Sequence, residues 1–178
     1  MGAEKWEVRK RAEESTTNYM NMNKRFIFSL ALCLVTGVTI AQDTTRKQSV
    51  EIIASFIDEI VKQYPIDPNN VTLIGFSQGA ILSYATALTY PEKVTKVVAL
   101  SGYFNQEIMP DEIDKNAISH LKFFVSHGSV DQVIPVDWAR KAKPALENLG
   151  LDVVYNEYPV GHGVAPQNFF DFKNWLQK

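Results

Sequence analysis

One serine of this chain lies in a motif that is typical of a catalytic nucleophile. Ser77 stands between two glycines in the run Gly75-Phe76-Ser77-Gln78-Gly79, which follows a short apolar segment and precedes one rich in Ala and Leu. A strand-to-helix turn of this composition exposes the serine hydroxyl at a helix N-terminus, where the helix dipole stabilises a developing anion. The motif predicts Ser77 as the nucleophile and the Gln78 N–H as an oxyanion donor. The alternative is an ordinary serine that caps a helix.

A serine hydroxyl is a weak nucleophile and needs a base, and the chain has three histidines. His162 lies between two glycines after the last predicted strand, so a loop can carry its ring close to Ser77. His127 ends a predicted strand, and we expect it to bond loop backbone as a structural residue. His120 precedes a strand at the opposite edge of the sheet, where we expect it to be exposed. The pattern therefore favours His162 as the general base.

The third group that this chemistry needs is an acid that orients the imidazole and stabilises its charged form. Asp131 follows the third predicted strand, just as Ser77 and His162 each follow a strand of their own. The chain order Ser, Asp, His is that of α/β-hydrolases and differs from the orders in chymotrypsin and subtilisin. The rival acids, which lie in a predicted loop or at a helix start, are Asp111, Asp114 and Asp137.

An alternation of strands and helices must position these three side chains. Apolar residues such as Val50, Ile53 and Ile57 recur at helical spacing, whereas short apolar runs predict buried strands. Strands that alternate with helices form parallel βαβ units, so the sequence predicts an α/β fold with a mostly parallel sheet flanked by helices. The predicted strands are 71–74, 94–100, 122–126 and 153–158, and the predicted helices are 45–63, 79–88, 136–149 and 166–177.

The composition excludes several classes of protein. The chain has 178 residues, of which 46% are hydrophobic and 21% charged, and this balance is that of a globular protein. A net charge of −2 gives no basic excess that would favour nucleic acid or an acidic membrane surface, so we expect no nucleic-acid partner. The single cysteine excludes an intramolecular disulfide framework and a zinc site built from several cysteines.

Residues 22–41 have the pattern of a signal peptide. Lys24 and Arg25 precede the uncharged run 26–40, and small residues stand at the cleavage positions that end at Ala41. A helix needs about 20 apolar residues to span a bilayer, and the uncharged run is shorter than that. We therefore expect no stable membrane span. The pattern predicts export to the periplasm or out of the cell. The alternatives are a buried strand or core helix, or an uncleaved membrane anchor.

The residues before this segment are unusual for a signal peptide, because they mix acidic and basic side chains. Met20 and Met22 are alternative starting residues, and Met22 would give a compact basic segment before the apolar run. Our hypothesis is therefore that residues 1–21 are a disordered leader or belong to an extended reading frame.

From about residue 66 to residue 178 the sequence resembles the carboxylesterase/phospholipase family of α/β-hydrolases, which includes acyl-protein thioesterases. The resemblance implies a serine hydrolase that cleaves carboxylic esters or thioesters of small acyl substrates through an acyl-enzyme, with no metal and no cofactor. It implies the same roles for Ser77, Asp131 and His162 as their spacing does. The matching stretches are 75–80, 99–103, 127–131, 133–135 and 161–163.

The front of the sequence departs from the family pattern. In this fold a second oxyanion donor comes from a loop after an early strand, near a His-Gly-Gly-type motif. The residues between Gln42 and Ser77 are enough for one helix and one strand, which leaves no room for an early strand and its loop. We therefore expect 42–178 to be a truncated α/β-hydrolase domain without its N-terminal strands. The strand before Ser77 would then be an exposed sheet edge, and we expect self-association through it. The alternatives to an active esterase are a catalytically impaired remnant and a peptidase of the same fold.

Two apolar residues after the second predicted strand are candidates for substrate binding. Phe104 and Met109 stand in the segment 102–120, which we expect to form a loop with one helical turn. Side chains of this kind can line an apolar acyl site next to the carboxyl ends of the strands. The alternative is that both residues only cover the hydrophobic core.

Overall fold

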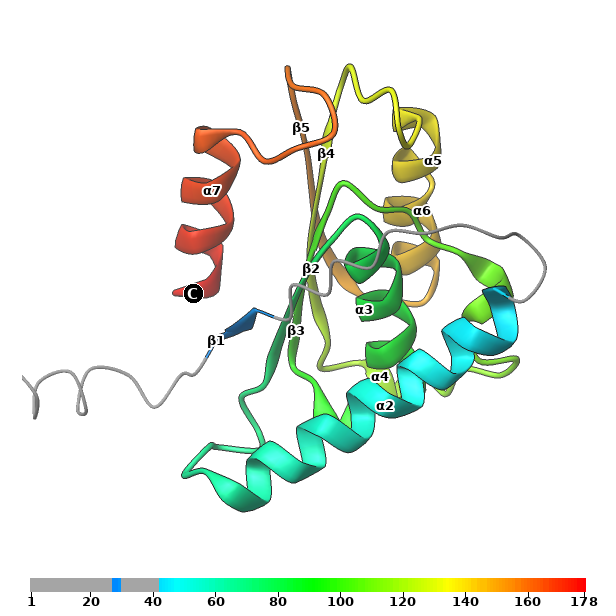
Figure 1. Cartoon of the computed structure of the whole chain (residues 1–178), viewed down its shortest axis with the longest axis vertical. Coiled ribbons are helices and arrows are strands. Elements are labelled where there is room, and N and C mark those ends of the chain that lie inside the picture. The colour runs from blue at the N-terminus through cyan, green and yellow to red at the C-terminus, as the bar shows by residue number, and fades with distance from the viewer. Residues whose placement is uncertain (1–26, 30–41) are drawn as a thin grey trace, which may run out of the picture.

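The strands of this chain form one parallel sheet, which Figure 1 shows nearly edge-on. The structure, a computed structural model, describes residues 27–29 and 42–178. The strands in these residues are β1 Ile27–Ser29, β2 Thr72–Phe76, β3 Lys96–Leu100, β4 Lys122–Gly128 and β5 Asp152–Tyr158. Their order across the sheet is β1-β2-β3-β4-β5, and every neighbouring pair is parallel. The carboxyl ends of all these strands therefore lie at the same edge.

Helices cover both faces of this sheet, as the alternation of elements predicts. The helices are α2 Gln42–Gln63, α3 Gln78–Thr89, α4 Lys115–Ile118, α5 Val136–Arg140, α6 Ala142–Asn148 and α7 Pro166–Leu176, with short 3-10 helices η1 Pro91–Lys93 and η2 Gln106–Ile108. Figure 1 shows α7 on one face of the sheet, and α2, α3, α5 and α6 on the other. The arrangement confirms the predicted α/β fold.

Successive residues of the strands pack into two separate cores, because side chains along a strand alternate between the faces of a sheet. Val97 and Phe123 belong to the larger core, which α2, α3 and α6 cover. Their neighbours Val98 and Phe124 belong to a smaller core, which Phe172 of α7 helps to close. Burial on both faces explains why these strands are continuous apolar runs in the sequence.

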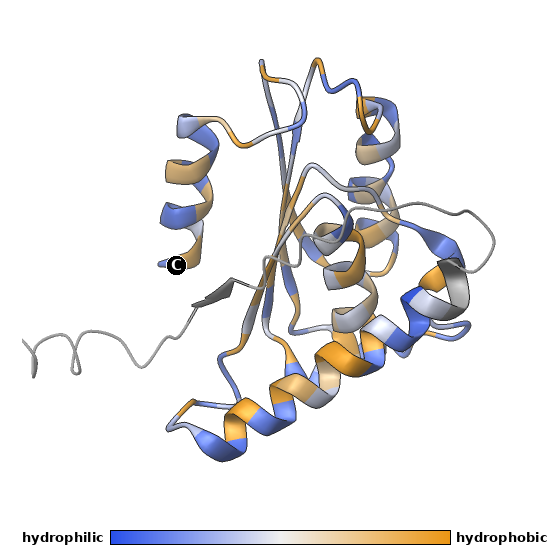
Figure 2. Cartoon of the chain, in the orientation of Figure 1, coloured by the Kyte–Doolittle hydropathy of each residue, from blue (hydrophilic) through white to orange (hydrophobic). Residues whose placement is uncertain are grey.

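Helix α2 is amphipathic, as its apolar spacing predicts. Val50, Ile53 and Ile57 are buried in the larger core, whereas Ile52 and Phe56 are exposed. Figure 2 shows hydrophobic and hydrophilic bands that alternate along this helix. Among the described residues, no helix has both the length and the apolar character that a membrane span requires.

The predicted helix 136–149 is wrong as a continuous element, because the structure divides it into α5 and α6 around Lys141. Pro144 lies in the first turn of α6 and has no N–H to donate to the Arg140 carbonyl four residues earlier. The ladder of helical hydrogen bonds is therefore interrupted at this turn, and the second helix starts afresh.

The edge of the sheet next to β2 differs from the sequence expectation. Ile27–Ser29 form β1, which pairs with residues 72–74, so this part of β2 is not an exposed edge. Gly75 and Phe76 lie beyond this pairing. The segment 22–41 thus contributes a short strand to the sheet, which was one alternative to a signal peptide. Most of 22–41, and the whole of 1–21, lie outside the described residues, so the signal peptide and the leader stay predictions, as does self-association.

Candidate active site

Ser77 stands in a strained turn between the end of β2 and the start of α3. Its backbone has φ 54° and ψ −119°, and a positive φ is uncommon for any residue other than glycine. The Ser77 N–H donates to the Leu100 carbonyl at 2.8 Å, which fixes the turn to the end of β3. The hydroxyl makes no capping hydrogen bond to α3. The structure therefore differs from the alternative of an ordinary capping serine.

The tightness of this turn depends on the glycine two residues before Ser77. A Cβ atom on Gly75 would lie 2.2 Å from the carbonyl oxygen of Gly79, a distance that backbone atoms cannot tolerate. Without that Cβ, the first turn of α3 packs directly against the end of β2. The Gly-x-Ser-x-Gly spacing thus reflects a close approach of helix and strand, in addition to the conformation of Ser77 itself.

His162 joins Ser77 and Asp131 in one chain of hydrogen bonds. The Nδ1–H of His162 donates to Asp131 Oδ2 at 2.7 Å, and the Ser77 hydroxyl donates to His162 Nε2 at 2.9 Å. The carboxylate accepts hydrogen bonds only, so it places the ring proton on Nδ1 and leaves Nε2 free to accept. The arrangement can therefore withdraw the proton from the Ser77 oxygen.

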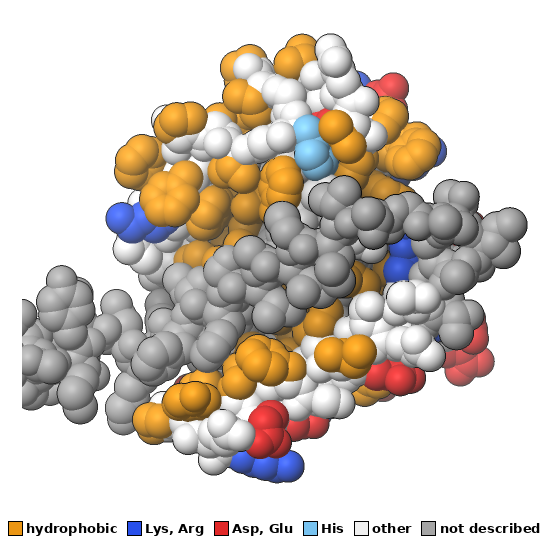
Figure 3. Space-filling view, in the orientation of Figure 1, with side chains coloured by type: hydrophobic (Ala, Val, Ile, Leu, Met, Phe, Trp, Pro, Cys, Tyr) orange, Lys and Arg blue, Asp and Glu red, His pale blue; other side chains and the backbone are white. Residues whose placement is uncertain are grey.

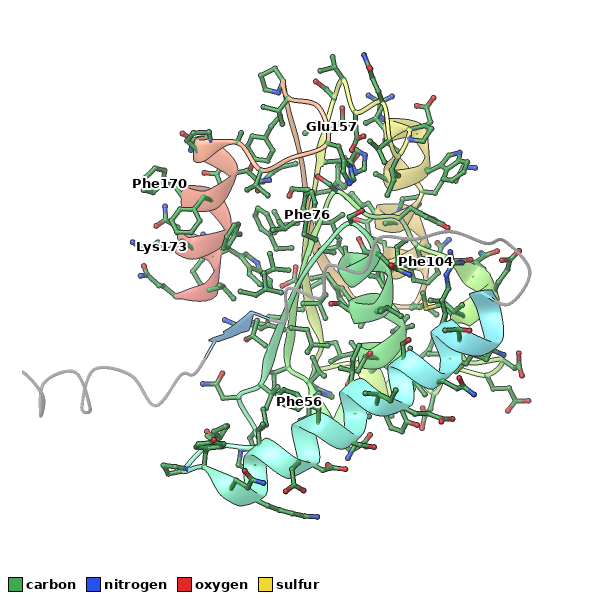
Figure 4. All side chains as sticks on the ribbon, in the orientation of Figure 1. Phe56, Phe76, Phe104, Glu157, Phe170 and Lys173 are labelled. Carbon is green, nitrogen blue, oxygen red and sulfur yellow. The ribbon has the colours of Figure 1, made fainter. Side chains whose placement is uncertain are left out.

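Phe76 packs beside this histidine and restricts where its ring can go. The two ring centroids are 4.9 Å apart with an interplanar angle of 50°. Figure 4 labels Phe76 near the end of β2, between α7 and α3 in this view. Figure 3 shows further hydrophobic side chains around a histidine on this face of the molecule. An apolar surrounding of this kind suits an acyl group better than a charged one.

Asp131 accepts hydrogen bonds from its own loop as well as from His162. Its Oδ1 accepts hydrogen bonds from the Val133 N–H at 2.8 Å and from the Ile134 N–H at 3.0 Å, and its side chain is fully buried. Burial alone would raise the pKa of this carboxyl. The hydrogen bonds from His162 and from the two backbone N–H groups, with the nearby charge of His162, outweigh burial and hold the pKa of Asp131 below its ordinary value.

The two other histidines lie where the sequence predicts. His120 is exposed, and its Nε2 contacts the carbonyls of Pro91 and Val94. His127 is buried, and its Nε2–H donates to the Ile134 carbonyl at 2.9 Å, which confirms a structural bond to loop backbone. The same nitrogen also lies 3.2 Å from Asp131 Oδ2, a contact that the sequence did not indicate.

The rival acids have other partners. Asp114 caps α4 through the Asn116 N–H at 2.8 Å, and Asp137 pairs with Arg140 at 2.8 Å. Asp111 lines a hollow beside α2. The aspartate that contacts His162 is thus Asp131.

The remaining predicted site residues lie in different parts of the structure. Gln78 begins α3 directly after Ser77, so its backbone N–H belongs to the first turn, where helical N–H groups lack helical partners. Phe104 is half-buried against Tyr84 and lines a groove of about 430 Å³. A Cβ on Gly102, two residues before Phe104, would lie 2.9 Å from the Ser77 carbonyl oxygen, so this loop starts beside Ser77.

Met109 lies elsewhere. It is buried in the larger core and borders a hollow that also contacts Thr89 and Tyr90, at the far end of α3. Because α3 has 12 residues and a helix rises 1.5 Å per residue, the two ends of α3 are about 18 Å apart. The structure therefore does not bring Met109 to Ser77 and favours the alternative that it covers the core.

Two buried polar residues near the site have roles that no sequence motif indicates. Ser101 follows β3 and donates its hydroxyl to the Gly163 carbonyl at 3.2 Å, next to His162. Asn168 of α7 donates to Ser126 Oγ of β4 at 2.9 Å. Ser101 falls within the stretch 99–103 that carries the resemblance, but a serine type alone does not reveal such a bond. In the described part of the chain, no three His, Cys, Asp or Glu side chains gather as a metal site would need.

Comparison with known proteins gives consistent matches. A family model described as Phospholipase/Carboxylesterase matches residues 10–178, a span that begins well before residue 66. Acyl-protein thioesterase 1 of Kluyveromyces lactis is 38% identical over 137 residues, which cover 74% of this chain and 59% of that protein. Carboxylesterase SOBER1 of Arabidopsis thaliana is 27% identical over 137 residues, which cover 74% of this chain and 58% of that protein. The chain thus spans about half the length of the curated relatives it matches.

Solved structures share this fold. A crystal structure of a single-residue variant of Arabidopsis thaliana SOBER1 has a TM-score of 0.65 at 25% identity, and the match covers 76% of this chain and 65% of that one. The Bacillus cereus carboxylesterase has a TM-score of 0.68 at 22% identity, and the match covers 86% of this chain and 68% of that one. These likenesses agree with the parallel sheet and its helices.

The first prediction concerns the turn at Ser77. We expect Gly75→Ala to lower the free energy of unfolding by about 1–3 kcal/mol, because the new Cβ forces α3 away from β2. Urea unfolding followed by circular dichroism measures this change. Gly161→Ala is the control, since a Cβ there meets nothing closer than 4.0 Å. Equal stability of the two variants would contradict the close packing of the turn.

The second prediction concerns the ionisation of Asp131. Because its pKa is lowered in the folded protein, the unfolded chain binds more protons between the folded pKa and about 3.9, the ordinary value for aspartate. The resulting stabilisation is fully present above the unfolded pKa and is lost as pH falls through the folded pKa. We expect Asp131→Asn to lose stability less steeply than the wild type below about pH 4, as measured by urea unfolding at a series of pH values. Asp111→Asn, at an exposed position, should keep the steep wild-type dependence.

Proposed function

Because the chain belongs to the phospholipase/carboxylesterase family, we propose that it is a serine hydrolase that cleaves carboxylic esters or thioesters through an acyl-enzyme. The observation that supports this most strongly is the hydrogen-bonded chain from Asp131 through His162 to the Ser77 hydroxyl. In this proposal Ser77 is the nucleophile, His162 the general base and Asp131 the acid that orients the imidazole.

Acylation begins with proton transfer to His162. As the Ser77 oxygen attacks the acyl carbonyl carbon, its proton moves to Nε2, which it already faces at 2.9 Å. The carbonyl oxygen becomes an oxyanion, and the imidazolium then gives the proton to the departing alcohol or thiol. Water repeats the sequence on the acyl-enzyme: His162 takes its proton, the acid is released, and Ser77 recovers its hydrogen.

Asp131 supports this transfer because its carboxylate carries a negative charge at neutral pH. Its lowered pKa and the 2.7 Å bond to Nδ1 keep that charge beside the ring that becomes positive. Two backbone N–H groups satisfy the other carboxylate oxygen, so the side chain cannot turn away. The acid therefore stabilises the imidazolium and fixes the tautomer that the base needs.

The oxyanion would lie at the N-terminus of α3. The Gln78 N–H stands there, and the helix dipole adds a favourable positive potential. A second donor from an early loop is expected in this fold. In this proposal Phe104, whose loop starts beside Ser77 and which lines a groove of mixed polar and apolar side chains, contacts the acyl or leaving group.

The third prediction tests the nucleophile. We expect wild-type protein to react with a fluorophosphonate probe and to hydrolyse short p-nitrophenyl esters, and Ser77→Ala to lose labelling and about 10⁴- to 10⁶-fold in kcat. Ser55→Ala, on the exposed part of α2, is the matched serine control and should react like the wild type. Folded wild-type protein without labelling would favour the impaired remnant. Cleavage of peptides without cleavage of esters would favour the peptidase.

We also propose export of the chain through residues 22–41, which rests on the basic, apolar and small-residue pattern of that segment. The alternative to cleavage is that Ile27–Ser29 remain part of the folded protein as strand β1. The fourth prediction is that N-terminal sequencing of protein purified from its native host begins at Gln42. If the folded protein yields a peptide that contains residues 27–29, the segment has not been removed, and the export proposal is wrong.

A further inference from the structure

We propose that Ser101 is a positioning residue that holds the His162 loop in place for proton transfer. This inference rests on the proposed function, because it concerns the same base. Ser101 follows β3, between the strand that leads to Ser77 and the strand that leads to Asp131. Three features carry the proposal: a strained backbone, complete burial and a side-chain bond to the residue after His162.

The backbone of Ser101 is strained in a way that serine does not favour. Its φ is 51°, and in the described part of the chain only Ser77 shares a positive φ among residues other than glycine. A left-handed conformation costs free energy when a Cβ is present, and such strain persists where the surroundings fix it. Glycine would remove this cost. The presence of serine therefore points to a use for its hydroxyl.

The hydroxyl of Ser101 contacts the loop that carries the base. Ser101 Oγ donates to the Gly163 carbonyl at 3.2 Å, and Ser101 itself is fully buried. Gly163 directly follows His162, in a loop that has glycine on both sides of the histidine. Two flanking glycines give this loop considerable backbone freedom. A bond to its carbonyl from a fixed strand end restricts that freedom at the point where the ring is attached.

The strand end that supplies this bond is itself tied to both neighbouring strands. The Ser101 N–H donates to the Ser126 carbonyl of β4 at 2.8 Å. The preceding residue, Leu100, accepts from the Ser77 N–H at 2.8 Å. Ser101 thus links the turn of the nucleophile, the strand before the acid and the loop of the base. A shift of this residue would change the distance from His162 Nε2 to Ser77 Oγ.

The hydroxyl can be separated from the rest of this arrangement. The two backbone bonds do not involve the side chain, so they survive in Ser101→Gly and Ser101→Ala. Ser101→Gly also removes the backbone strain, whereas Ser101→Ala keeps it. If the hydroxyl positions His162, both variants lose catalysis, although their stabilities differ. If the residue serves only the fold, activity follows stability and the glycine variant is as active as the wild type.

The experiment compares Ser101→Gly, Ser101→Ala and Thr95→Val in ester hydrolysis, fluorophosphonate labelling and urea unfolding. Thr95 is the matched control, because it flanks the other end of β3 and its hydroxyl also donates to a backbone carbonyl, that of Val71, at 2.9 Å. We expect kcat and the labelling rate of both Ser101 variants to fall about 10- to 100-fold, as for a small displacement of a catalytic group. KM should stay within about twofold, because the hydroxyl is engaged with the Gly163 carbonyl and acts through the loop of the base.

The outcomes separate this inference from the proposed function. Unchanged kcat in Ser101→Gly, with wild-type protein that hydrolyses ester, would overturn the positioning role alone. Wild-type protein that folds but neither labels nor hydrolyses would overturn the proposed function. We expect Ser101→Gly to unfold at a urea concentration equal to or above that of Ser101→Ala, and Thr95→Val to keep wild-type kcat. A glycine variant that is stable but slow would support the role of the hydroxyl.

Discussion

Parallel pairing of the strands is the constraint on which the whole site depends. Ser77 and His162 are 85 residues apart, yet their side chains meet because each follows a strand that ends at the same edge of the sheet. The register aligns these ends: Phe76 stands opposite Leu100, which stands opposite Ser126. A slip of two residues would move a strand by about 6.6 Å along its axis, more than twice the length of a hydrogen bond. The register of the strands therefore determines how closely the Ser77 and His162 side chains can approach.

Strained backbone conformations at two strand ends also determine where the site residues lie. Ser77 and Ser101, at the ends of adjacent strands, both have positive φ, and backbone hydrogen bonds tie these strand ends to their neighbours. Strain of this kind persists only where the surroundings determine the conformation. The buried cores on the two faces of the sheet supply that rigidity, since strands packed on both sides cannot relax at their ends. The stability of the sheet thus holds Ser77 in a conformation that the isolated turn would leave.

Much of this fold and site follows from local sequence patterns. Apolar runs and helical spacing predict β2 to β5, and the order Ser77, Asp131, His162 at three strand ends predicts which side chains meet. Other features depend on contacts that no local pattern encodes. The apolar composition of 27–29 suits a strand and a signal peptide equally, and its pairing with the distant β2 is a contact that the segment alone does not encode. Met109 lies after the expected strand, but packing carries it to the far end of α3. The positive φ of Ser101 has no signature, because glycine follows it and is the residue type expected to take that conformation.

In the proposed mechanism, the groups that activate Ser77 and the groups that stabilise the oxyanion come from different parts of the fold. The described residues place the Ser77 hydroxyl against His162, His162 against the Asp131 carboxylate, and the Gln78 N–H at the N-terminus of α3. Loss of a single oxyanion donor costs about 10²- to 10³-fold in kcat, whereas loss of the serine nucleophile costs about 10⁶-fold. Activation of Ser77 depends on β2, β3, β4 and β5, which the described structure contains. Stabilisation of the oxyanion depends in part on a loop that this fold draws from an early strand. The proposed activation of Ser77 is thus the larger of the two contributions, and it rests on elements that belong to the described structure.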